Sequence, residues 1–331
     1  MRRLKAEWES QNAVLLAYPH KNSDWGDDLE AAKIPFFKMA QAIAYSQMVY
    51  LLCDDSNEAK KDFCSTTNII FIEANYNDTW IRDYGPLSAK ESGKNILLDF
   101  KFNGWGGKFE ASLDNKITKF LHSKGFFGAT PLKSYDFELE GGAIESDGDG
   151  TILTTTSCLL NPNRNGGLSQ KEAENLLKEY LGAKRVLWIE NSYLEGDDTD
   201  GHIDMLARFV SNDTIAYIKC EDSADSHYKS LLEMERELKS FKTSDGKPYN
   251  LVALPFPEPK YKNSSRLPAS YANFLITNKA VILPTYQDKQ DRVAIDTLKK
   301  LFPTREIIPI PSLKLIEQGG SVHCSTMQVS F

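Results

Sequence analysis

Short apolar runs alternate with amphipathic stretches along the whole chain. Five stretches have apolar positions at the spacing of a helix, namely residues 28–46, 111–124, 169–181, 223–241 and 289–301. An apolar run precedes each stretch and another follows it, which predicts a strand on either side. The preceding runs are residues 13–18, 95–102, 151–155, 214–219 and 280–285, and the following runs are residues 48–53, 129–132, 186–189, 251–254 and 307–310. The unit of strand, helix and strand therefore recurs about every 55 to 85 residues, as in a repeat architecture.

The third helix has the clearest boundaries. Ser169 is followed three residues later by Glu172, the spacing of a capping box. Gly182 comes directly after the last apolar position and is typical of a helix C-terminus. We therefore expect this helix to span residues 169–181.

Four of the strands that precede helices are predicted to be second arms of hairpins. Polar turns separate them from an earlier alternating run, at residues 89–94, 146–150, 211–213 and 277–279. The fifth first arm would come from the C-terminal end of the chain, residues 320–324, and pair with the N-terminal run 13–18. This pattern predicts an α/β fold of five ββαβ modules in a ring, closed by pairing of the N- and C-terminal strands.

A doubly wound α/β sheet is the alternative fold. It would bind a ligand at a switch point, but the chain contains neither GxGxxG nor GxxxxGK[ST]. In the ring, by contrast, the start of every first arm would lie near one axis. Chemically capable residues stand at these places, and they are Asp83, Glu140, His202, Asp204, Asn273 and Cys324.

Cys324 is the candidate nucleophile. It follows Gly319 and Gly320 where a turn enters a predicted strand, and it would react as the thiolate. His202 is the candidate proton donor and acceptor. One residue separates His202 from Asp204, so in a strand both side chains would project to the same face. His323 would face away from Cys324, and we do not expect it to be the base.

Two further carboxylates, Asp83 and Glu140, have neighbours in the sequence that indicate a role in the site. Asp83 follows Trp80 by three residues, and an aromatic ring beside a carboxylate suits a planar cation. Glu140 precedes two glycines and could orient the imidazole as the third group of a triad does. For each group taken singly, a role in packing or at the solvated surface stays open.

Composition and charge narrow the classes of function. The 331 residues are 41% hydrophobic and 26% charged, as in a globular protein, and we expect one catalytic domain spanning residues 1–331. The net charge of −7 without a basic tract argues against nucleic-acid binding. It favours a small cationic substrate.

No run of about 18 apolar residues predicts a membrane span, and residues 1–7 are followed by no apolar signal-peptide segment. The five cysteines are scattered, which suits free thiols in a reducing cytoplasm. No CxxC or HExxH spacing indicates a metal site. A homo-oligomer is compatible with the sequence, which does not fix the oligomeric state.

Seven blocks of the chain, in order, resemble motifs of the agmatine deiminase family. This family is part of the guanidine-modifying superfamily and is related to bacterial peptidylarginine deiminases. The blocks cover nearly the whole chain and are residues 77–86, 102–107, 139–142, 160–165, 196–204, 266–274 and 318–324.

The resemblance implies a five-bladed α/β propeller. It also implies hydrolysis of agmatine to N-carbamoylputrescine and ammonia, a reaction of putrescine and polyamine biosynthesis, without metal or organic cofactor. In the implied mechanism Asp83 and Asp204 hold the guanidinium, with Trp80 beside it. Cys324 attacks the central carbon, and His202, oriented by Glu140, transfers the protons.

The resemblance leaves the other end of the substrate less defined. The run 195–200 is acidic and has no Arg or Lys near it in the sequence, which favours an amine over a free carboxylate. Asp198 is the predicted contact to the amine. Deimination of arginine in peptides and amidino transfer are alternative activities, and a non-catalytic guanidine-binding protein is a third.

Overall fold

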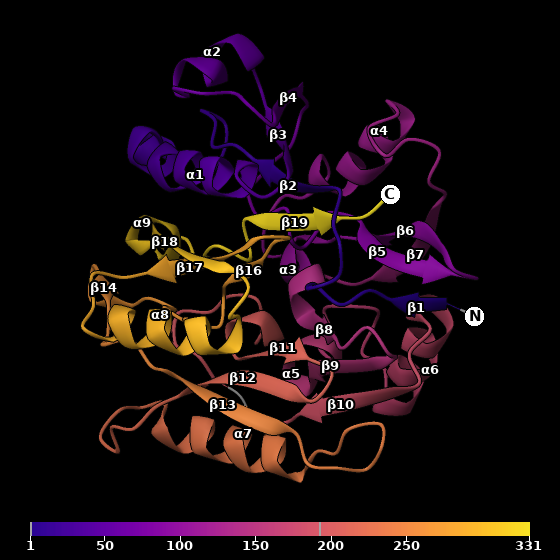
Figure 1. Cartoon of the computed structure of the whole chain (residues 1–331), viewed down its shortest axis with the longest axis vertical. Coiled ribbons are helices and arrows are strands. Elements are labelled where there is room, and N and C mark those ends of the chain that lie inside the picture. The colour runs from indigo at the N-terminus through magenta and orange to yellow at the C-terminus, as the bar shows by residue number, and fades with distance from the viewer. Residues whose placement is uncertain (1, 192) are drawn as a thin grey trace.

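The computed structural model describes residues 2–191 and 193–331 and has a mixed α/β fold (Figure 1). Four of the five predicted helices are present as single helices, and they are α1 (Leu29–Ala44), α6 (Gln170–Leu181), α7 (Tyr228–Ser240) and α8 (Gln290–Leu301). The helix predicted for residues 111–124 was too long. Residues 111–124 contain only the 3-10 turn η2 (Asp114–Lys116) and the short helix α4 (Ile117–Ser123).

The predicted ends of α6 are confirmed. The Ser169 hydroxyl accepts a hydrogen bond from the backbone N–H of Glu172, and the Glu172 side chain accepts one from the backbone of Ser169. Gly182 ends the helix in the left-handed conformation with φ 74°, where a side chain would be strained. Local sequence alone therefore sets both ends of this helix.

Five sheets share one pattern of strand pairing. In each, an antiparallel pair is followed by a third strand that is parallel to the second. The first strands of the pairs are β5 (Leu87–Glu91), β8 (Ile144–Ser146), β11 (Ala207–Ser211), β16 (Leu275–Ile276) and β19 (Thr326–Val329). The second strands are β6 (Lys94–Lys101), β9 (Thr151–Thr155), β12 (Thr214–Lys219), β17 (Ala280–Thr285) and β2 (Ala13–Ala17). The third strands are β7 (Leu132–Glu138), β10 (Arg185–Ile189), β13 (Asn250–Pro255), β18 (Glu306–Pro311) and β3 (Met48–Cys53).

The predicted pairing of the chain ends is confirmed, but the predicted residues of the C-terminal strand were wrong. Residues 320–324 belong to the turn before β19 and do not pair with β2. β19 pairs antiparallel with β2, with Thr326 opposite Leu16 and Val329 opposite Ala13, and the two strands lie side by side in Figure 1. The first and last parts of the chain thus form one sheet. β3 also pairs with β4 (Ile69–Glu73), and β5 with β1 (Arg2–Leu4).

Several short elements were not predicted. They are α2 (Ser56–Lys61), α3 (Gly104–Gly107), α5 (Thr156–Leu159), α9 (Leu313–Ile316), the hairpin of β14 (Tyr261–Lys262) and β15 (Ser265–Arg266), and the edge strands β1 and β4. One or two turns of helix are too short for a periodic signal. The strand expected near residues 129–132 begins only at Leu132.

The longer helices lie toward the outside of the molecule, and the strands lie nearer its middle (Figure 1). Every residue of β2 and of β9 is buried, as expected for strands covered on both faces. The turns that enter the first strands therefore end in the interior. No helix in residues 2–191 and 193–331 is long and apolar enough to cross a membrane.

Candidate active site

The candidate residues lie on turns that lead into the first strands of the five sheets. Asp83 precedes β5, Glu140 precedes β8, His202 and Asp204 precede β11, Asn273 precedes β16, and Cys324 precedes β19. The repeated topology thus brings these residues together from distant parts of the chain. The convergence expected from the ring of modules is present.

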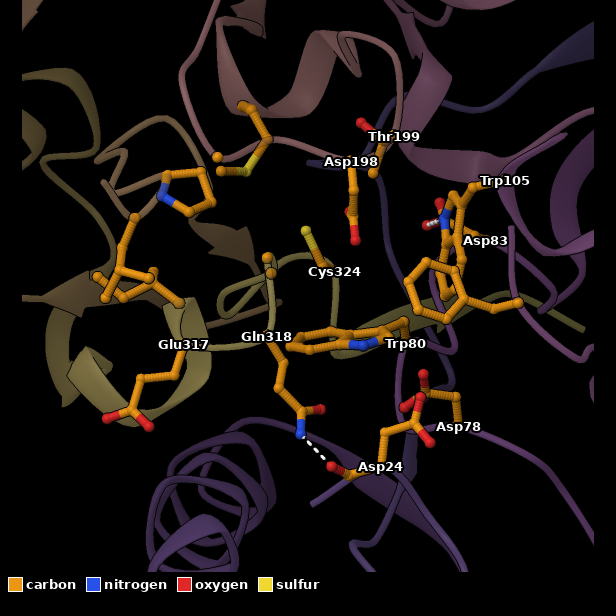
Figure 2. Close-up of a pocket in the computed structure, with 18 of the residues that line it drawn as sticks. Asp24, Asp78, Trp80, Asp83, Trp105, Asp198, Thr199, Glu317, Gln318 and Cys324 are labelled. Carbon is orange, nitrogen blue, oxygen red and sulfur yellow. Dashed lines mark hydrogen bonds between the residues drawn. The ribbon is translucent and has the colours of Figure 1, made fainter. Parts of the chain in front are cut away.

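A pocket of about 360 Å³ lies at this convergence (Figure 2). Its lining includes Trp80, Asp83, Trp105, Asp198 and Cys324. This volume is within the usual range for a small-molecule site. Trp105 belongs to the loop 104–107 that could cap the site, whereas Trp25 packs behind the wall, 5.9 Å from Trp80 between ring centroids.

Cys324 is only 6% exposed but reaches the pocket. The Asn273 side-chain amide donates a hydrogen bond to its sulfur, with Nδ2 and Sγ 3.1 Å apart, and Asp204 Oδ2 lies 3.9 Å from Sγ. Burial, and then the negative charges of Asp204 and Asp83, raise the pKa of the thiol well above its ordinary value. The free protein therefore holds Cys324 mainly as the thiol near neutral pH.

Asp83 is fixed by two donors from different turns. Trp105 Nε1 donates to Oδ2 and the backbone N–H of Gly142 donates to Oδ1, each at 2.9 Å. Burial raises the pKa of Asp83. The positive charge of His202 lowers it, whereas the negative charge of Asp204 raises it further. A cation placed between Asp83 and Asp204 would relieve this repulsion.

Asp204 is held from behind by His323. Nδ1 of His323 lies 2.7 Å from Asp204 Oδ2, and Nε2 lies 2.7 Å from Glu7 Oε2. Burial favours the neutral carboxyl, but the hydrogen bond and charge of His323 lower the pKa of Asp204. His323 is absent from the pocket lining among the described residues, in agreement with its predicted direction away from the substrate.

The prediction that His202 and Asp204 lie on one strand face was wrong. His202 precedes the 3-10 turn η4 (Ile203–Met205), which contains Asp204, so the alternation of a strand does not apply. The two side chains nevertheless meet, because a β-carbon on Gly142 would lie within 3.1 Å of both. Only a residue without a side chain fits between them.

His202 lies beside Asp83, with Nδ1 and Oδ1 3.7 Å apart. Burial alone would lower the pKa of the imidazolium, but the negative charge of Asp83, followed by the effects of Cys158 and Glu140, raises it well above its ordinary value. His202 is thus suited to carry a proton at neutral pH. A charged imidazole can donate that proton to a leaving group.

Glu140 is tied to a residue that was not singled out from the sequence. Arg164 Nε donates to Glu140 Oε1 at 2.6 Å, and Arg164 Nη1 donates to Asp200 Oδ2 at 2.7 Å. Glu140 makes no direct hydrogen bond to His202, although a carboxylate oxygen and a ring nitrogen lie within 4.8 Å. Arg164 lies in the matched block 160–165, which was its only signal in the sequence.

The Trp80 ring forms one wall of the pocket and packs on Gly320. A β-carbon at residue 320 would lie 2.3 Å from the ring, so this approach requires glycine. Figure 2 shows Trp80, Asp83, Asp198 and Cys324 around the same space. The aromatic face and the two carboxylates Asp83 and Asp204 together suit a planar cation.

The pocket lining is acidic. Asp24, Asp78 and Asp198 are part of it. Burial, and then the charge of Asp197, raise the pKa of Asp198 to about 6, and burial raises the pKa of Asp78 to about 7. A bound ammonium group would favour the charged forms of these carboxylates.

The run 195–200 has basic neighbours in space that the local sequence does not show. Lys108 Nζ donates to the backbone carbonyl of Asp198 and to Asp200 Oδ1, at 2.6 and 2.7 Å. Arg266 also lines the pocket, but both of its terminal nitrogens are bound to Asp225. The preference for an amine therefore rests on the acidic lining.

The state of the Cys324 thiol can be tested directly. The pKa shift predicts that iodoacetamide alkylates Cys324 slowly at pH 7 and faster as the pH rises. Asp83→Asn removes one nearby negative charge, lowers the thiol pKa and should speed alkylation at pH 8 by roughly 10-fold. Mass spectrometry of the Cys324 peptide measures the rate, with exposed Cys64 as an internal reference. An equal rate in both proteins would contradict this electrostatic explanation.

Comparison with known proteins identifies the family. The family model described as Porphyromonas-type peptidyl-arginine deiminase matches residues 3–330. The chain belongs to this family. A Vibrio parahaemolyticus protein named "Putative agmatine deiminase" is 33% identical over 98% of this chain and 95% of its own length.

Solved structures of family relatives have the same fold. An agmatine deiminase of C. jejuni with substrate bound is 39% identical and has a TM-score of 0.94, covering 99% of this chain and 96% of that one. A Porphyromonas gingivalis structure named "Putative Arginine Deiminase" is 46% identical with a TM-score of 0.95, over 99% and 98% of the two chains. The family resemblance inferred from the sequence motifs is thereby confirmed.

Proposed function

We propose that this protein is an agmatine deiminase, acting as a single catalytic domain. It hydrolyses agmatine to N-carbamoylputrescine and ammonia. The observation that carries the proposal is the pocket lined by Cys324, Asp83 and further acidic residues, with Asp204 Oδ2 lying 3.9 Å from the Cys324 sulfur. Relatives named agmatine deiminase match over the full chain.

Substrate binding would activate the nucleophile. The guanidinium lies between Asp83 and Asp204 and over the Trp80 ring, so its positive charge offsets the two carboxylates that raise the thiol pKa. Cys324 then loses its proton to solvent more readily when the substrate is present than when it is absent. The thiolate forms close to the carbon that it attacks.

Two addition and elimination steps complete the reaction. Cys324 Sγ bonds to the guanidinium carbon, and His202 gives its proton to the departing ammonia. This leaves a thiouronium on Cys324. His202, now neutral, takes a proton from water as the water oxygen bonds to the carbon. The C–S bond then breaks, and the remaining hydroxyl proton passes to the Cys324 thiolate, which releases the neutral ureido product and restores the thiol. The negative charge of Glu140 favours the protonated imidazole, and Arg164 holds Glu140 in place.

We assign the primary amine of agmatine to Asp198. The expected effect of Asp198→Asn is a rise in KM for agmatine of roughly 10- to 100-fold with a smaller change in kcat, because one charge-assisted hydrogen bond is lost. Steady-state ammonia release measures both constants. Asp136→Asn, which changes a carboxylate that is 96% exposed, is the matched control. A lower kcat with an unchanged KM would argue against the assignment.

A second candidate activity is deimination of arginine in peptides. The description of the matching family favours it, as does a solved structure named "putative peptidyl-arginine deiminase", which is 44% identical to this chain. The acidic lining of the pocket disfavours free arginine, whose carboxylate is negatively charged. It does not disfavour an arginine residue in a peptide, where that group is an uncharged amide. The two substrates therefore have to be compared directly.

We also propose that the five sheets with shared strand order are the blades of a five-bladed α/β propeller. The repeated pairing pattern and the pairing of β19 with β2 support this arrangement. It accounts for the position of the site, since each blade would place the turn before its first strand near one axis.

Isotope incorporation tests the proposed reaction. In H₂¹⁸O, the protein should convert agmatine to N-carbamoylputrescine that carries one ¹⁸O in its ureido group, with one ammonia released for each product. Mass spectrometry and an ammonia assay provide the two measurements. Consumption of agmatine only when an amine acceptor is added, with no labelled product, would indicate amidino transfer instead.

A further inference from the structure

A second buried cysteine lies close to the candidate histidine. Cys158 is in α5, has no exposed surface and was not assigned any role from the sequence. One ligand atom each from Glu140, Cys158 and His202 lies within 4.8 Å of the others. None of the three residues is part of the pocket lining described above. The cluster adjoins the pocket through Asp83, whose Oδ1 lies 3.7 Å from His202 Nδ1. It shares His202 and Glu140 with the proposed reaction, in which Cys158 has no role.

The cluster has buried polar atoms that lack partners. Within the part of the chain that the structure describes, both ring nitrogens of His202 and Oε2 of Glu140 make no hydrogen bond. The other oxygen of Glu140 is bound to Arg164. Unpaired buried polar atoms are rare and costly, and these three atoms belong to side chains that face Cys158. They are therefore available to a ligand.

The chemical nature of the cluster indicates the ligand. A thiolate, an imidazole and a carboxylate form a donor set suited to Zn²⁺ and other thiophilic divalent cations. Metal–ligand bonds of about 2.0 to 2.3 Å would require the cluster to contract slightly around the ion. Asp83 adds negative charge 3.7 Å from His202 Nδ1, whereas the positive charge of Arg164 opposes a cation.

We propose that Glu140, Cys158 and His202 form an inhibitory site for a thiophilic divalent cation such as Zn²⁺. The thiol of Cys158 and the imidazolium of His202 each release one proton to solvent as the sulfur–metal and nitrogen–metal bonds form. The inhibitory effect rests on the proposed function, because the bound ion would hold the imidazole that transfers protons. Binding itself does not require the protein to be a deiminase.

Cobalt provides a spectroscopic test that does not depend on activity. Co²⁺ bound to a thiolate gives a charge-transfer absorption in the near ultraviolet. We expect Cys324→Ala to show this band on titration with Co²⁺, and Zn²⁺ to abolish it by displacement. In the Cys324→Ala/Cys158→Ser protein the band should be lost, whereas Cys324→Ala/Cys64→Ser is the matched control and should keep it.

Three results would overturn the proposal. They are the absence of the band in Cys324→Ala at millimolar Co²⁺, its persistence in the Cys158→Ser double variant, and its presence only when Cys324 is intact. Circular dichroism establishes that each variant is folded. Should Cys158→Ser not fold, Glu140→Gln in the Cys324→Ala background replaces it, with an expected loss of Co²⁺ affinity of roughly 100-fold, and unchanged affinity would equally refute the site.

Inhibition is measured separately. Zn²⁺ should inhibit ammonia release by the wild-type protein, and the residual activity of Cys158→Ser should need roughly 100-fold more Zn²⁺ for half inhibition. Equal sensitivity of the two proteins would refute the inhibitory role. A protein that binds Co²⁺ through Cys158 but releases no ammonia from agmatine would refute the proposed function and leave the metal site in place.

Discussion

Replacing Cys324 with alanine is expected to lower kcat for ammonia release from agmatine by roughly 10⁴- to 10⁶-fold, the size of effect seen when a covalent nucleophile is removed. Alanine lacks the sulfur that bonds to the guanidinium carbon, so neither the first C–N cleavage nor the thiouronium can occur. Binding should survive, because Asp83, Asp204 and Trp80 are unchanged. Ammonia release and calorimetric titration with agmatine measure the two properties.

Cys64→Ala is the matched control for this prediction. Cys64 is a free, exposed thiol, and its replacement should leave turnover within about twofold of the wild type, as for an ordinary surface change. Retention of more than a few per cent of activity by Cys324→Ala would remove Cys324 from the mechanism. Loss of activity in both variants would instead point to general sensitivity to cysteine replacement.

The second large effect is expected for His202→Gln. This change removes the proton donor to ammonia and the base for water, and it should lower kcat by roughly 10²- to 10⁴-fold. If hydrolysis of the intermediate is slowed more than its formation, the thiouronium will accumulate on Cys324. Rapid acid quenching and intact-protein mass spectrometry would detect it as agmatine less ammonia added to the protein.

His122→Gln is the corresponding control. His122 lies on α4, where its ring bonds the backbone carbonyl of Thr130, and its loss should leave kcat almost unchanged. The pH profile adds a second readout. Because the structure raises the pKa of His202, wild-type activity limited by the protonated imidazole should fall only above the ordinary range of histidine, and His202→Gln should lose this limb. A wild-type profile that falls near pH 6.5 would contradict the assignment.

The repeat of strands and helices could be predicted because it depends on local pattern. The predicted limits of β3, β9, β12 and β17 agree with the structure, since an apolar run bounded by polar turns sets them. The pairing of the two chain ends, seen as β2 with β19, could be predicted because the first module lacked a first arm and the C-terminal end of the chain could supply one. The main site residues could be predicted to lie together because each stands just before the first strand of a module.

Contacts between distant turns could not be predicted in this way. The strand alternation applied to His202 and Asp204 failed because tertiary contacts fold this segment into η4. Neither the Arg164–Glu140 ion pair nor the position of Cys158 beside His202 has a local signature. Such contacts depend on how the turns pack against each other at the centre of the molecule.

The most direct test of the central claim is the release of ammonia by the purified protein from three substrates in parallel: agmatine, free arginine and an arginyl peptide blocked at both ends. We predict that kcat/KM for agmatine exceeds the values for both other substrates, and that Cys324→Ala is inactive. Release from the blocked peptide but not from agmatine would contradict the account and identify a peptidyl-arginine deiminase.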